Sequence, residues 1–151
     1  MSAASPPIDR KQNLDQRRAA DAWAKINSIA HLPDKKRCED YTGEAHKLPV
    51  RIMASGVGQA LAFLFAKQKK KPGLEQLVGD LSKWVLVERH LENGVRVSGI
   101  EVPAKSDLLQ AILVSDTDFL RWATDETLAY LQWINRFAEG LGHDPVTTND
   151  D

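Results

Sequence analysis

The amino-acid sequence predicts an all-α fold, a single-domain bundle of about five to seven helices around a central apolar helix. Apolar residues recur at intervals of three and four through most of the chain, and Gly or Pro separates the periodic segments. Strand-like alternation occurs at residues 95–103, where it supports one short irregular hairpin at most, so no credible sheet is predicted. At 151 residues, of which 42% are hydrophobic, the chain is long enough for one domain with one core.

The predicted central helix runs from residue 49 to residue 66. Pro49 suits the first position of a helix, because an N–H there would have no intrahelical partner. Apolar residues lie all round the helical wheel, so we expect this helix to be buried. Gly56 and Gly58 each cost about 1 kcal/mol inside a helix, which we attribute to close approach of a neighbouring element. The strongly polar side chains of the segment are only Arg51, Ser55 and Gln59.

Two segments before this helix are expected to be helical. The first helix should begin at Asp9 or Asn13 and end at Ala30, shortly before a proline. A turn or two of helix is expected around residues 41–47. The inward stripe of the first helix is Ala19, Ala22, Trp23, Ile26, Ile29 and Ala30.

Pro72 and Gly73 follow a lysine-rich run and are predicted to end the central helix. A further helix should start at Leu74 and present one apolar stripe. The stretch 95–103 is expected to be a loop, since it supports one irregular hairpin at most. The stripe after the Pro-Gly pair is Leu74, Leu77, Val78, Leu81, Trp84, Val85 and Leu91.

The last third of the chain is predicted to hold three helical segments. The first begins at Ser106 or Asp107 and runs through Leu113, and residues 116–123 form another turn or two. The final helix ends at Gly142, and its inward face consists of Thr127, Tyr130, Leu131, Ile134, Phe137, Ala138 and Leu141. The predicted divisions are a disordered tail at 1–8, a helical bundle domain at 9–142 and an acidic tail at 143–151.

Three segments carry a more specific pattern. They are GVGQALAFL at residues 56–64, RRAADAW at 17–23 and RWATDETLAYL at 121–131, the last leading into Trp133 and Phe137. In their order and spacing, over roughly residues 12–142, they resemble the small helical (fifth) subunit of the type III-B CRISPR effector, the Cmr complex. Val57 stands where the family pattern usually has Leu.

The resemblance implies a helical, non-catalytic protein of antiviral defence. Its partners would be the other Cmr subunits, copies of itself in a minor filament, the target RNA and the crRNA. Such subunits help to form the channel along which target RNA lies. Filament contacts would use exposed aromatic side chains such as Trp84 or Trp133, although either can equally belong to the core.

The distribution of charge agrees with an anionic partner at one end of the chain. The net charge is −1, yet residues 1–75 carry 14 Lys and Arg against 8 Asp and Glu, whereas residues 76–151 carry 6 against 13. Lysines without interleaved aromatic residues favour contact with the RNA backbone over base reading. The predicted RNA-binding residues are Arg17, Arg18, Lys47, Arg51, Lys67, Lys69 and Lys70.

Only part of that set rests on the resemblance. Arg17, Arg18 and Arg51 fall in or beside the matching motifs, whereas the lysines rest on charge alone. An isolated charge such as Arg51 in an apolar helix needs a partner, which can be solvent, an internal carboxylate or a phosphate. For the lysines at the helix end, simple solubility is the alternative to RNA contact.

No motif predicts an enzyme, a metal site or a cofactor. The GxG at residue 56 lacks a preceding strand and a third glycine, there is no P-loop, and the four histidines are scattered. A carboxylate cluster lies at or near expected helix starts, where capping is favoured over catalysis. This cluster consists of Asp116, Asp118, Asp125 and Glu126.

The remaining expectations concern location and alternatives. Cys38 is the lone cysteine, which excludes an internal disulfide, and no segment resembles a signal peptide or a membrane span. We therefore expect a cytoplasmic protein without a membrane or small-molecule partner. A helical adaptor that binds only proteins is the first alternative. The second is a small hydrolase built on the acidic cluster, for which loss of activity in D118A and D125A with the fold retained would be the mark.

Overall fold

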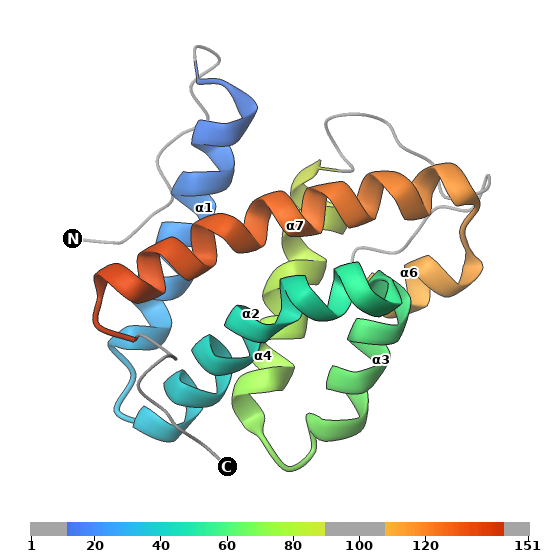
Figure 1. Ribbon diagram of the computed structural model, residues 1–151. Helices are drawn as coiled ribbons and strands as arrows, with labels where there is room; N and C mark the ends of the chain where they lie inside the picture. Colours follow the sequence, from blue (N-terminus) through green and yellow to red (C-terminus); the bar gives the residue numbers. More distant parts are fainter. Residues whose placement is uncertain (1–11, 90–107, 144–151) are drawn as a thin grey trace.

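The computed structural model describes residues 12–89 and 108–143 (Figure 1). Within these ranges the chain forms six α-helices and one π-helix without any strand, which confirms the predicted all-α single-domain bundle. None of the described helices is long and apolar enough to cross a bilayer. The predicted tail at 1–8, the loop at 95–103 and the acidic tail beyond His143 lie outside the described residues. The elements are α1 (Leu14–Ala30), α2 (Lys35–Ser55), α3 (Val57–Lys67), α4 (Pro72–Ser82), the π-helix η1 (Lys83–Glu88), α6 (Leu108–Val114) and α7 (Thr117–Gly140).

Helix α1 begins at one of its two predicted starts. The Oδ1 atom of Asn13 accepts from the N–H of Gln16 at 2.8 Å, and the Gln16 side chain accepts from the N–H of Asn13 at 2.9 Å. This capping box satisfies two backbone donors that would otherwise lack a partner. The helix buries Ala22, Ile26 and Ile29 as predicted, whereas Trp23 is exposed.

The predicted single helix over residues 49–66 is wrong. Residues 49–66 are divided between α2 and α3 by Gly56, whose φ of +88° lies in a region that L side chains rarely adopt. The N–H of Gly56 donates to the carbonyl of Ile52, and its own carbonyl accepts from the N–H of Ala60, so one residue ends α2 and begins α3. The expected burial on all sides is also wrong, since Met53 is 80% exposed and Phe65 53%.

Pro49 lies inside α2 and not at a helix start as predicted. A proline there leaves the carbonyl four residues earlier, that of Ala45, without its helical donor. The Nδ2 atom of Asn135, on α7, donates to this carbonyl at 3.0 Å. A side chain on another helix therefore supplies the missing hydrogen bond. Helix α2 also includes residues 41–47, for which only a turn or two of helix was expected.

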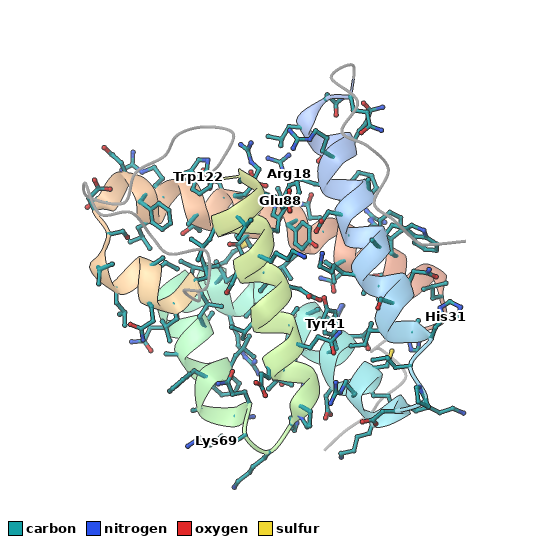
Figure 2. The ribbon with its side chains drawn as sticks, turned by 180° about the vertical axis from the view of Figure 1, so that it is seen from behind. Arg18, His31, Tyr41, Lys69, Glu88 and Trp122 are labelled. Carbon is teal, nitrogen blue, oxygen red and sulfur yellow. The ribbon has the colours of Figure 1, made fainter. Side chains whose placement is uncertain are left out.

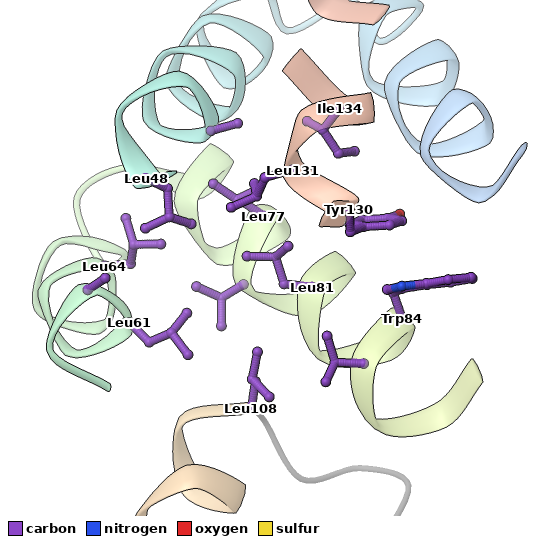
Figure 3. Close-up of a cluster of buried hydrophobic side chains, with 14 of the residues drawn as sticks. Leu48, Leu61, Leu64, Leu77, Leu81, Trp84, Leu108, Tyr130, Leu131 and Ile134 are labelled. Carbon is purple, nitrogen blue, oxygen red and sulfur yellow. The ribbon is translucent and has the colours of Figure 1, made fainter. Parts of the chain in front are cut away.

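Every described helix contributes to the core, which is not gathered around the segment predicted from the sequence. Helix α4 packs against α2, α3 and α6 and continues into η1, which reaches α7. Figure 3 shows Leu77, Leu81 and Trp84 of this segment among buried side chains of the surrounding helices. Pro72 is the first residue of α4, so the Pro-Gly pair starts this helix as well as following α3.

A neighbouring helix approaches closely at Gly73. It does not do so at Gly56 or Gly58, for which the sequence predicted a close approach. A Cβ on Gly73 would lie 2.8 Å from the Cβ of Asp40 and from the backbone nitrogen of Tyr41, both on α2. A Cβ on Gly58 would make an ordinary contact, 3.6 Å from Ile112. Gly73 therefore sets how closely α4 packs on α2.

Residues 116–123 and the final helix, predicted as separate segments, form the single helix α7 along one side of the bundle (Figure 1). Its inward face is as predicted for Thr127, Tyr130, Leu131, Ile134 and Ala138, whereas Leu141 lies beyond its end and is exposed. Trp84 belongs to the core, where its ring stacks on Tyr130 with centroids 5.2 Å apart. The half-buried Trp133 donates from Nε1 to Asp15 at 3.0 Å.

Candidate nucleic-acid interface

The structure does not bring the predicted RNA-binding residues together on one surface. Figure 2 shows Arg18 and Lys69 at opposite ends of the molecule. Their elements explain this separation, because α1 packs on α7 while the lysines follow the far end of α3. The set is distributed as Arg17 and Arg18 on α1, Lys47 and Arg51 on α2, Lys67 at the end of α3, and Lys69 and Lys70 between α3 and α4.

Arg18 is engaged inside the molecule. Its Nε and Nη2 atoms donate to the two carboxylate oxygens of Glu126 at 2.5 and 3.1 Å, and its Nη1 donates to Asp15 at 3.3 Å. The side chain is 17% exposed, and the bond to Glu126 raises the pKa of the guanidinium above its ordinary value. Its charge is therefore largely compensated before any RNA approaches.

Glu126 links three elements in a buried ionic cluster. Besides the bonds from Arg18, the Glu126 carboxylate accepts from Nε of Arg89 at 2.7 Å and from Nε1 of Trp84 at 3.1 Å. Trp84 lies on η1, and Arg89 directly follows this helix. Burial would raise the pKa of Glu126, but the hydrogen bonds from Arg18, Trp84 and Arg89 outweigh it and hold the pKa below its usual value. The carboxylate thus stays ionised and ties α1 and the end of η1 to α7.

The capping prediction holds for only part of the acidic cluster. Asp116 caps α7, since its Oδ1 accepts from the N–H of Phe119 at 2.9 Å, and Asp118 lies in the first turn. Asp125 and Glu126 lie further along α7, so their assignment to a helix start is wrong. No group of three His, Cys, Asp or Glu residues is arranged to hold a metal ion within 12–89 and 108–143.

Arg51 pairs with an internal carboxylate, one of the alternatives left open by the sequence. Its Nη1 donates at 2.5 Å to Oε2 of Glu44, which lies two turns earlier on α2 and is 4% exposed. Its guanidinium carbon lies 3.9 Å from the ring centroid of Phe63 on α3. The Arg51 side chain remains 28% exposed, so a fixed guanidinium still reaches solvent.

Lys67 approaches the same ring. Its ammonium lies 4.3 Å from the Phe63 centroid, one helical turn away on α3. Lys67, Lys69 and Lys70 are exposed, and the described residues place no carboxylate within ion-pair distance of any of them. We call these three lysines the α3 basic end. It is a net positive surface beside the paired Arg51.

Glu44 and Phe63 were missed as members of this arrangement. The spacing of Phe63 and Lys67, four positions apart on one helix, was a usable signal. Glu44 and Arg51 are seven positions apart, which is two turns, but a helix predicted to begin at Pro49 hides that relation.

A separate groove of about 450 Å³ lies between α2 and α7. Arg136 and Glu139 bring opposite charges to it, so it has no clear preference for an anion. Its lining consists of His46, Pro49, Gln132, Asn135, Arg136 and Glu139.

The family model described as CRISPR-associated protein (Cas_Cmr5) matches residues 14–141. The chain belongs to the Cmr5 family. The match begins at the first residue of α1 and ends just after α7, so it covers the whole described bundle. The resemblance found in the sequence is confirmed, and the chain is a small subunit of the type III-B CRISPR complex with the other Cmr subunits as partners.

Proposed function

We propose that this Cmr5-family chain is a non-catalytic structural subunit that lines the path of RNA through the Cmr complex in the cytoplasm. The observation that carries RNA contact is the α3 basic end, Lys67, Lys69 and Lys70, whose charges are not compensated by carboxylates of the described residues. The non-catalytic role is supported by the structural use of Asp116 and Glu126, two of the four carboxylates considered for hydrolysis.

The chemistry of lysine favours contact with the phosphate backbone of target RNA and crRNA. An ammonium group neutralises phosphate charge whatever the base, so the interaction positions a strand without reading its sequence. A complex in which pairing between guide and target supplies specificity needs such a contact. Copies of the chain stacked in a filament, as the resemblance implies, would repeat the α3 basic end along the strand.

An adaptor that binds only proteins is the second candidate. Val50 and Met53, one turn apart on α2, are exposed apolar side chains, which favours a protein partner for this part of α2. This candidate predicts assembly with the other subunits and no salt-dependent binding of RNA.

Binding of single-stranded RNA at several salt concentrations distinguishes the two candidates. The full chain, alone and in the assembled complex, is compared with K69E/K70E and with K35E/K36E, an adjacent pair of exposed lysines at the start of α2 that changes the net charge equally. We expect a log–log slope of about −0.7 per phosphate contacted, reduced in K69E/K70E and retained in K35E/K36E. No salt-dependent binding by the chain alone, and equal slopes for wild type and K69E/K70E in the intact complex, would favour the adaptor.

A further inference from the structure

Four residues on either side of the break between α2 and α3 form one compact arrangement. Glu44 holds Arg51 through a 2.5 Å ion pair, and Arg51 and Lys67 lie over the ring of Phe63 at 3.9 and 4.3 Å. In an unbroken helix the twelve positions between Arg51 and Phe63 would separate the two residues by about 18 Å along the axis. The turn at Gly56 is therefore what brings the two cations to one ring.

The arrangement keeps a net positive charge. Arg51 and Lys67 contribute two positive charges, and the buried carboxylate of Glu44 compensates one. Arg51 uses Nη1 for Glu44, and a guanidinium has five N–H donors, so others remain for a ligand. A phosphodiester carries one negative charge and several acceptor oxygens, which matches this excess and these donors.

Phe63 has a positioning role here and is not a platform for a base. Two cations, Arg51 and Lys67, already lie over its ring, and the Phe63 side chain is partly buried against the core. A long basic side chain that is free in solution loses rotamer entropy when it is fixed. Stacking on Phe63 and pairing with Glu44 restrict Arg51 in advance, so less of that loss remains at the moment of binding.

We propose that Arg51 and Lys67 bind one phosphate of an RNA backbone, with Glu44 and Phe63 holding the two cations in place. This inference rests on the proposed RNA contact and specifies where one phosphate is held. It differs from a diffuse basic surface in one respect: an uncharged residue, Phe63, contributes to RNA affinity.

The test compares F63L with F65L in the full chain and in the assembled complex. Both substitutions are on α3, remove one phenyl ring and leave the net charge unchanged; Phe65 is 53% exposed, and no cation of the described chain lies over its ring. The probe is a labelled oligouridine, with binding measured at several salt concentrations. We expect F63L to weaken binding at low salt about two- to five-fold and F65L to leave it within two-fold.

Two further variants keep the test decisive if F63L loses helicity in circular dichroism. R51A and K67M should each reduce affinity, and the double variant should lose less than the product of the two losses, because both cations serve one phosphate. Equal binding by F63L and F65L would overturn the phosphate site, and so would independent losses of affinity in R51A and K67M. In either case, salt-dependent RNA binding by the wild-type chain would still support the proposed function. No wild-type RNA binding in either setting would overturn both.

Discussion

Replacing Asn135 by alanine should destabilise the bundle through a carbonyl on a different helix. Pro49 supplies no N–H to the carbonyl of Ala45, and Asn135 donates to it at 3.0 Å. Ala45 is fully buried, so the carbonyl would be left without a partner. An unsatisfied buried polar group costs about 1–3 kcal/mol. At about 2–4 °C per kcal/mol for a chain of this size, we expect Tm to fall by several degrees.

A double-mutant cycle with P49A isolates this mechanism. An alanine in place of Pro49 can donate its N–H to the carbonyl of Ala45, so N135A should cost little in the P49A background, with a coupling energy of about 1 kcal/mol or more. Gln132 lines the same groove from α7, and its side chain makes no hydrogen bond to another described residue, so Q132A serves as the control and should change stability by less than about 0.5 kcal/mol. Urea unfolding of the full chain, followed by circular dichroism, measures all variants. An equal cost of N135A in both backgrounds would refute the argument.

Three further tests, each by urea unfolding, address the packing and the buried charges. G73A should destabilise strongly because its Cβ would lie 2.8 Å from the backbone nitrogen of Tyr41, whereas G79A, in the same helix with open space around it, should stabilise by up to about 1 kcal/mol; a tolerated G73A would contradict the close packing. E126A should cost about 3–5 kcal/mol by leaving buried guanidinium groups without their carboxylate, and a loss below about 1 kcal/mol would contradict this. Burial raises the pKa of Asp80, so its ionised form opposes folding at pH 7 and its protonation favours folding as the pH falls through the folded pKa. D80N, which can still accept from Tyr41, should therefore stabilise more at pH 7 than at pH 4, and equal effects would contradict the sign.

The elements that could be predicted from the sequence are those determined by neighbours along the chain. Asn13 and Gln16 form a local capping box, and the stripe of α7 from Thr127 to Ala138 follows helical periodicity. Such patterns depend on residues within a few positions of each other. The helical class followed from the periodicity, whereas the family resemblance rested on the residues of three segments, 17–23, 56–64 and 121–131.

The errors come from partners far away in the sequence. Pro49 marks a helix start only if no other donor reaches the carbonyl of Ala45, and Asn135 lies 90 positions later. Arg18 resembles an RNA-facing cation until Glu126, 108 positions away, is placed beside it. Charge and periodicity give the type of a side chain and its face, but not the partner that a tertiary fold provides.

Photo-crosslinking in the assembled Cmr complex is the most direct test of RNA contact by this chain. A target RNA that carries 4-thiouridine at successive positions would be irradiated, and the crosslinked peptides of this chain identified by mass spectrometry. The proposed contact predicts crosslinks within residues 51–70, repeated at regular intervals along the RNA if copies stack in a filament. Crosslinks confined to α1 or α7, or none in a fully assembled complex, would contradict it.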